Sequence, residues 1–206
     1  MLLITVATAV EAQLLRRHLG DTDRGLLAGQ PVALLETGIG PVSAASAVAL
    51  FLARQDVSGV VVCGIGGAYP GSGFKPLDVV CAESETFGDI GVETQERFLD
   101  LEELGFGQSA FTLDLFPTER RARFVTVATC TGTDERARSL EERTRGDIES
   151  MEGAAVAQVA SALGVLCGEV RGISNMVGKR DRASWRVEEA SEAAQRALLA
   201  WLAAGF

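Results

Sequence analysis

Positions 59–68 of this 206-residue chain have the sequence GVVVCGIGGA, and this stretch decides the fold class. Its first half, Gly59–Cys63, is a β-branched apolar run of the length of a buried strand. Glycines follow at positions 64, 66 and 67, and clustered glycines in a core-forming chain mark backbone that turns sharply or approaches a ligand closely. We therefore expect a strand over 59–63 and a ligand-side glycine turn over 64–68, because ligands of α/β sheets bind beyond the carboxyl ends of the strands.

Apolar runs and amphipathic segments alternate on both sides of this stretch. Further strands are expected at 2–7, 32–35, 77–82, 124–129 and 165–173, with a short extended segment at 147–151. Helices are expected at 10–19, 41–54, 134–143, 152–163 and 184–204. The stretch 84–117 is the least regular, and we expect loops and a short helix there. The alternation predicts an α/β sandwich with a largely parallel or mixed sheet, in a single domain over 1–206.

The composition excludes several classes of protein. Hydrophobic residues make up 47% of the chain, which is enough for a sizeable core and excludes a disordered chain. The net charge of −9 argues against nucleic acid or an anionic membrane as a partner. Aromatic residues are only 6% of the chain, which also disfavours a surface for stacking bases.

Cofactor and metal motifs are missing from the sequence. The four cysteines (63, 81, 130 and 167) and the single histidine, His18, have no metal-ligand spacing, so we expect no metal and interpret the cysteines as small hydrophobic residues of a reducing compartment. A dinucleotide fingerprint would need glycine where Tyr69 stands, and neither a P-loop nor a Gly-x-Ser-x-Gly motif occurs, so no organic cofactor is expected. No cationic leader is visible and no apolar run reaches the roughly 18 residues of a membrane span, so a cytoplasmic location is expected.

Polar residues follow several of the predicted strands. Glu11 follows the first strand, Met151 and Glu152 lie where the short extended segment becomes a helix, and Ser174 and Asn175 follow the strand through Val170. Each has a structural explanation when taken alone, because a carboxylate in a first helical turn is favoured by the helix dipole and asparagine is a common turn residue. Their common position at carboxyl ends of strands nevertheless indicates one site.

Five segments together resemble one family. They are VATAVE at 6–11, TGIGP at 37–41, GIGGA at 64–68, ESMEGAA at 149–155 and RGISN at 171–175. This combination is similar to the nucleoside phosphorylase and methylthioadenosine nucleosidase superfamily, which implies a three-layer αβα sandwich with a central mixed, largely parallel sheet. The segments GAYPGSG at 67–73, DIGVET at 89–94 and ISNMVGKRDR at 173–182, followed by Trp185, resemble the branch that hydrolyses futalosine, a hypoxanthine nucleoside of menaquinone biosynthesis.

The resemblance implies cleavage of a purine N-glycosidic bond through a ribosyl cation. It assigns Glu11 to orienting and activating water, and Glu152 to accepting hydrogen bonds from the ribose 2′- and 3′-hydroxyls. Met151 is expected to pack on the sugar, and Ser150 and Ser174 to contact the substrate. A carboxylate at position 11 repels phosphate and therefore favours hydrolysis over phosphorolysis.

Asn175 predicts the base. Adenine-specific relatives carry aspartate in the matching Ile-Ser-Asp segment, whereas the amide of Asn175 can donate to both N7 and a 6-oxo oxygen. Hypoxanthine is therefore expected over adenine. By the same resemblance, Gly66 and Gly67 let the backbone approach the base, and Ile65 stands where nucleosidases often have serine.

The resemblance leaves the 5′ group and the assembly open. Phe87, Phe98 and Phe106 are candidate walls of an apolar 5′ pocket that can borrow residues from a neighbouring subunit, and Arg180 or Arg182 is a candidate partner for a substrate carboxylate. A homodimer or homotetramer is implied. The alternatives are a methylthioadenosine/S-adenosylhomocysteine nucleosidase, a purine nucleoside phosphorylase and a catalytically silent purine-binding module.

Overall fold

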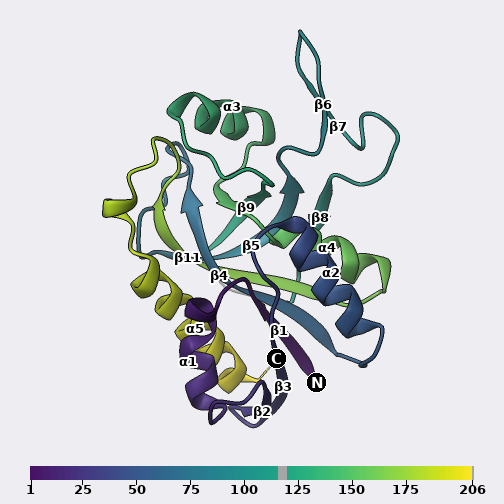
Figure 1. The fold of residues 1–206 in the computed structure, drawn as a ribbon, viewed down its shortest axis with the longest axis vertical. Coiled ribbons are helices and arrows are strands. Elements are labelled where there is room, and N and C mark those ends of the chain that lie inside the picture. The colour runs from purple at the N-terminus through teal and green to yellow at the C-terminus, as the bar shows by residue number, and fades with distance from the viewer. Residues whose placement is uncertain (116–119, 206) are drawn as a thin grey trace.

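The computed structural model describes residues 1–115 and 120–205, and its centre is a nine-stranded sheet (Figure 1). The strands are β1 (Leu2–Val6), β2 (Arg24–Leu27), β3 (Gln30–Glu36), β4 (Gly59–Ala68), β5 (Val79–Phe87), β6 (Gly91–Glu93), β7 (Phe98–Asp100), β8 (Ala110–Thr112), β9 (Arg121–Thr126), β10 (Ile148–Ser150) and β11 (Cys167–Met176). The helices are α1 (Ala9–His18), α2 (Pro41–Leu52), α3 (Asp134–Thr144), α4 (Gly153–Ala162) and α5 (Val187–Ala204), with a 3₁₀ turn at Arg182–Ser184.

The main sheet has the order β10-β9-β5-β11-β4-β1-β3-β2, and β8 pairs with β5. The central strand β4 runs parallel to both β1 and β11. Parallel pairing also joins β1 with β3, β5 with β9 and β9 with β10. Antiparallel pairing joins β2 with β3, β8 with β5 and β5 with β11. The expected mixed, largely parallel sheet is therefore confirmed.

Helices cover both faces of this sheet, which gives the three layers that the resemblance implies. Helices α1 and α5 pack together on one face, and α2 and α4 pack together on the other (Figure 1). One core cluster joins α1 and α5 to the sheet through Leu15, Leu198 and Leu202, and the other joins α2 and α4 through Val48 and Val156. Burial of these apolar side chains is the main source of stability, at about 25 cal/mol per Å².

The glycine segment is not the turn that we expected after Cys63. Strand β4 continues through Ala68, and its second half pairs with β11 on one side and with β10 on the other. The glycines are needed there because other groups occupy the space of a side chain. A Cβ on Gly64 would overlap Glu11 Oε1, and one on Gly67 would come within 2.7 Å of the Val177 side chain.

The region 84–117 also differs from the expectation. Within its described part there is no helix. Instead, β5 extends to Phe87, β8 pairs with β5, and β6 and β7 form a small hairpin that projects from the body of the protein (Figure 1). The edge strand β2 was not predicted, because its sequence RGLL has only a two-residue apolar run. No helix in the described part of the chain combines the length and apolar character that crossing a bilayer requires.

Candidate active site

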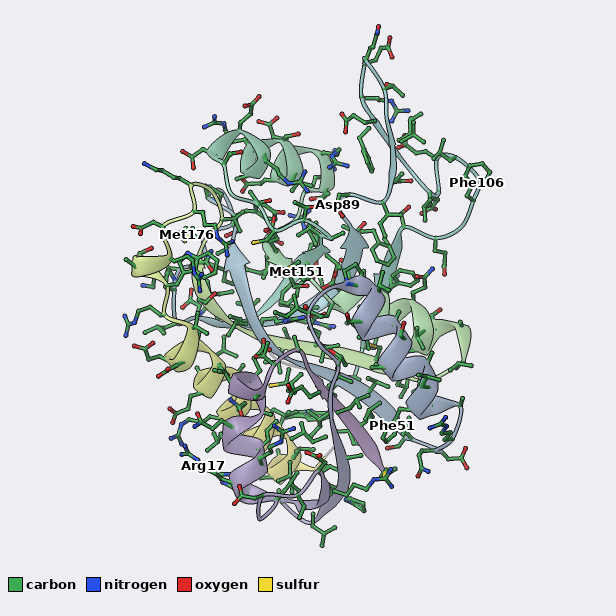
Figure 2. All side chains as sticks on the ribbon, viewed as in Figure 1. Arg17, Phe51, Asp89, Phe106, Met151 and Met176 are labelled. Atoms are coloured by element: carbon green, nitrogen blue, oxygen red, sulfur yellow. The ribbon has the colours of Figure 1, made fainter. Side chains whose placement is uncertain are left out.

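A cavity of about 570 Å³ lies where β4, β10 and β11 end and α1 begins. Its lining includes eight of the nine predicted site residues: Glu11, Gly66, Gly67, Ser150, Met151, Glu152, Ser174 and Asn175. Figure 2 shows Met151 near the middle of the molecule, between α3 and α1 in this view. A larger hollow of about 1170 Å³ lies between α3 and the β6–β7 hairpin, and the predicted residues in its lining are Phe87 and Phe98.

Glu11 is held at the start of α1 with almost no exposure to solvent. Thr8 precedes the helix, and its backbone N–H and its hydroxyl both donate to Glu11 Oε2 at 2.9 Å. The N–H of Ile65 donates to Oε1, also at 2.9 Å. Burial raises the pKa of Glu11, and the nearby Arg171 opposes this. Because a carboxylate oxygen accepts about two hydrogen bonds, Oε1 retains room for one further donor.

Glu152 comes immediately before α4 and is also buried. Its Oε1 accepts a hydrogen bond from the Gly40 N–H at 3.0 Å, and its Oε2 accepts one from Arg171 Nη2 at 3.2 Å. Gly40 has φ of +93°, a conformation that side-chain-bearing residues rarely adopt, so this N–H depends on glycine at position 40. Each oxygen of Glu152 can still accept from one hydroxyl, as two ribose hydroxyls require.

Arg171 links these two carboxylates, and our sequence analysis gave it no role. Its Nη1 lies 4.0 Å from Glu11 Oε1 and donates to the Ile65 carbonyl at 3.0 Å, while its Nε donates to Glu169 at 2.7 Å. Burial alone lowers the pKa of Arg171, but the three surrounding carboxylates outweigh it and raise the pKa. The signal was present in the sequence, because an arginine within a buried strand needs an anionic partner.

Asn175 lies just after a bulge in β11, beside the glycine half of β4. The Ser174 hydroxyl donates to Asn175 Oδ1 at 2.7 Å, and Asn175 Nδ2 donates to the Met176 carbonyl at 2.9 Å. The amide oxygen is therefore engaged by a donor, and one N–H of the amide remains free. Ser150, by contrast, donates behind the cavity wall to Glu85 Oε1 at 3.2 Å.

The three phenylalanines predicted to surround the 5′ group lie in different parts of the structure. Phe87 lies outside the cavity around Glu11: it is buried against Phe111, with ring centroids 6.2 Å apart, and lines the larger hollow. Phe106 is 78% exposed, on the loop between β7 and β8 to the right of the hairpin (Figure 2). Phe98 lies under the Arg143 guanidinium at 3.9 Å, beside the larger hollow.

Both candidate arginines do line the cavity, together with Trp185. The Arg180 guanidinium lies 4.9 Å from the centre of the Trp185 ring. Trp185 follows the family motif at 173–182, and only the fold shows that it lines the same cavity as Glu11.

The comparisons with known proteins agree with this geometry. The family model of the phosphorylase superfamily matches residues 3–203, so the chain belongs to this superfamily. The futalosine hydrolase of Thermus thermophilus is 38% identical over 189 residues, covering 86% of this chain and 84% of that protein. The futalosine hydrolase of Streptomyces coelicolor is 40% identical over 176 residues, covering 76% of this chain and 72% of that protein.

Solved structures show the same fold. The S-adenosylhomocysteine nucleosidase of Streptococcus pyogenes, in complex with 5-methylthiotubericidin, superposes with a TM-score of 0.86 over 100% of this chain and 97% of that chain, at 19% identity. The methylthioadenosine/S-adenosylhomocysteine nucleosidase of Neisseria meningitidis, in complex with methylthio-immucillin-A, has a TM-score of 0.85 over 98% of both chains, at 20% identity. At such identities the likeness concerns the fold alone.

Proposed function

We propose that this protein is a nucleosidase that hydrolyses the N-glycosidic bond of futalosine and releases hypoxanthine. The observation that carries the proposal is that Glu11, Glu152 and Asn175, which come from three distant segments, line one cavity of about 570 Å³. The futalosine hydrolases of Thermus thermophilus and Streptomyces coelicolor, which match most of the chain, support the choice of substrate.

Water is the nucleophile that suits this cavity. The remaining lone pair of Glu11 Oε1 accepts one hydrogen of a water molecule and directs its oxygen towards the anomeric carbon. Phosphate would need an uncompensated cationic pocket. The buried cation Arg171 is instead surrounded by Glu11, Glu152 and Glu169, so its charge is already neutralised. The site therefore favours hydrolysis over phosphorolysis.

Glu152 binds the ribose. Its two oxygens accept the 2′- and 3′-hydroxyls, and its negative charge stabilises the positive charge that develops at the anomeric carbon as the bond breaks. Because Gly40 and Arg171 hold both oxygens in place, this stabilisation needs little reorganisation during the reaction.

Asn175 binds the leaving base. Ser174 donates to its amide oxygen and the Met176 carbonyl accepts one of its N–H groups, so the second N–H is the donor that Asn175 can offer to a ligand. A 6-oxopurine presents acceptors at N7 and at the oxo oxygen on one edge, and a donor stabilises the negative charge that grows there. Adenine presents an amino donor at the second position and is matched less well.

Arg180 and Trp185 suit the 5′ substituent, which in futalosine is an aryl ketone with a carboxylate. Arg180 lies over one face of the Trp185 ring and offers a cation for the carboxylate, and the rest of the ring offers apolar surface for the aryl group.

A second copy of the chain is proposed to cover α2. This helix contains no charged residue, and Val42 and Leu50 on it are 79% and 59% exposed. Ile39, which precedes the helix, is 60% exposed and also lines the cavity. A homodimer through this face would bury the apolar surface and place the partner next to the substrate.

A product assay in phosphate-free buffer tests the function. The expected result is hypoxanthine release from futalosine, slower release from inosine and no adenine from methylthioadenosine. A requirement for phosphate would instead identify a phosphorylase, and preferential release of adenine would identify a methylthioadenosine nucleosidase; either result overturns the proposal.

A further inference from the structure

Two fully buried glutamates lie behind the cavity and have no part in the chemistry described so far. Glu85 is on β5 and Glu169 is on the neighbouring strand β11. Neither lines the cavity. Burying a carboxyl group is costly unless its oxygens are satisfied, so two of them side by side behind a site require a physical explanation.

The contacts of these two side chains place them against the start of α4. A Cβ on Gly153, the first residue of that helix, would overlap both Glu85 Oε1 and Glu169 Oε2, so these two oxygens are neighbours. Glycine at position 153 provides the space that they occupy. The preceding residue is Glu152, so the pair packs against the backbone next to a carboxylate-bearing residue of the proposed site.

The partners of the four oxygens show where a proton is missing. Glu85 Oε2 accepts from the Thr126 hydroxyl at 2.9 Å, and Glu85 Oε1 from the Ser150 hydroxyl at 3.2 Å. Glu169 Oε1 accepts from Arg171 Nε at 2.7 Å. Among the described residues, no N–H or O–H group donates to the buried Glu169 Oε2. Its neighbour is Glu85 Oε1, so one proton on Glu85, donated to Glu169, would satisfy it.

The charges lead to the same arrangement. Arg171 is the guanidinium that forms ion pairs here, with Glu11, Glu152 and Glu169, and Glu85 adds a fourth carboxyl group. Two adjacent carboxylates in a buried environment do not both ionise. With one shared proton, the pair carries a single negative charge that balances Arg171, and Glu11 and Glu152 keep theirs.

We propose that Glu85 and Glu169 share one proton and act as positioning residues, which hold Arg171 and the start of α4 so that Glu11 and Glu152 stay charged and correctly placed. Glu169 has the shortest ion pair with Arg171, at 2.7 Å, against 3.2 Å for Glu152 and 4.0 Å for Glu11. Without it, the guanidinium would draw closer to the site carboxylates and neutralise the charge that the ribosyl cation needs. This inference rests on the proposed function for its kinetic consequences only.

The surroundings of the pair define its response to pH. The ionisable groups that face it are Arg171 and Glu152 on the cavity side, and the thiols of Cys63 and Cys167. Burial and the adjacent Glu169 raise the pKa of Glu85 well above its ordinary value. A glutamate whose pKa is raised on folding stabilises the protein fully below its unfolded pKa, and this contribution is lost as the pH rises towards the folded value.

Glu85→Gln tests the shared proton without using catalysis. The amide supplies a permanent hydrogen to Glu169 Oε2 and still accepts from Thr126. We expect the infrared carbonyl band of a protonated carboxylic acid in the wild-type protein at neutral pH and its loss in the variant. We also expect the variant to gain thermal stability over the wild type, increasingly as the pH rises above about 4.3, the ordinary glutamate pKa. No difference in the band, or a loss of stability that is the same at every pH, would overturn the proposal.

Glu169→Gln tests the positioning role. The amide oxygen still accepts from Arg171 Nε, but the negative charge moves away from that atom. We expect kcat on futalosine to fall on the order of 10- to 100-fold with little change in KM. The acid limb of the kcat profile should move to lower pH, because Arg171 then acts more strongly on Glu11. Glu83→Gln, at an exposed position of β5, the strand that carries Glu85, should behave as wild type.

The two measurements separate this inference from the proposed function. An unchanged kcat and acid limb in Glu169→Gln would overturn the positioning role, even if futalosine is hydrolysed. A wild-type protein that does not hydrolyse futalosine would overturn the proposed function, and the infrared and stability measurements on Glu85→Gln would still decide whether the pair shares a proton.

Discussion

Arg171 Nη2 donates to Glu152 Oε2 at 3.2 Å, which joins strand β11 to the residue that precedes α4. The contact fixes the carboxylate that we assign to the ribose. Glu152→Gln keeps the shape of the side chain but removes the charge. We expect kcat for hypoxanthine release to fall by about 10²–10³-fold, since one well-placed electrostatic group contributes about 3–4 kcal/mol to the barrier. Steady-state kinetics measure this change, and a variant within a few-fold of wild type would exclude the assigned role.

The acid limb of the pH–activity profile reports the ionisation of Glu11. This residue must be ionised to orient water, and burial raises its pKa while Arg171 opposes the shift. Activity should therefore fall as the pH drops through a value above the ordinary glutamate pKa of about 4.3. Glu11→Gln should abolish turnover and retain binding of a substrate analogue. Measurable turnover in the variant with an unchanged pH profile would show that another group activates the water.

The base preference depends on the amide of Asn175. Asn175→Asp removes the N–H donor, and the new carboxylate cannot donate to a 6-oxopurine unless it is protonated. We expect the ratio of kcat/KM for inosine over adenosine to fall about 10- to 100-fold, corresponding to about 1–3 kcal/mol for one unsatisfied polar group. Inosine and adenosine differ in the base alone, so the ratio isolates this contact. Ser174→Ala, which releases the amide oxygen, should change the ratio in the same direction by less.

Local patterns predicted the elements better than they predicted the contacts between them. The apolar runs at 2–7 and 59–63 place β1 and β4 correctly, because a buried parallel strand is a continuous hydrophobic stretch. The continuation of β4 through Gly64 and Gly67 was missed, because the partners that stabilise a glycine-rich strand, β10 and β11, are more than 70 residues away in the chain.

Contacts between distant segments also limit what the sequence predicts about the site. The motifs around Glu11, Glu152 and Asn175 predicted residues that do line one cavity. Arg171 was not assigned a role, since two of its three carboxylate partners, Glu11 and Glu152, come from distant segments of the chain. Phe87 lies outside this cavity for a related reason: an aromatic residue near a site motif packs equally well in the core, and the ring of Phe87 lies against Phe111.

The assembly is tested on α2. Val42 is 79% exposed on a helix without charged residues, and a carboxylate there would be buried without a partner in the proposed homodimer. Val42→Glu should therefore shift the protein from dimer to monomer in sedimentation velocity or light scattering. Leu26→Glu is the matched control, because Leu26 is 63% exposed on the edge strand β2 and lies in another part of the sheet. Equal effects of both substitutions, or none, would exclude α2 as the interface.

The 5′ substituent of the substrate is tested at Arg180. Its guanidinium lies 4.9 Å from the Trp185 ring centre and is exposed, so an ion pair with a substrate carboxylate contributes about 0.2–1 kcal/mol. Arg180→Ala should raise KM for futalosine by up to about fivefold at low salt, and the effect should shrink as the salt concentration rises. The KM for inosine, which has no carboxylate, should not change. Arg182→Ala is the matched control, and a larger effect there would assign the carboxylate to Arg182 instead. An equal rise in KM for futalosine and inosine would show that Arg180 supports the shape of the cavity and does not bind the anion.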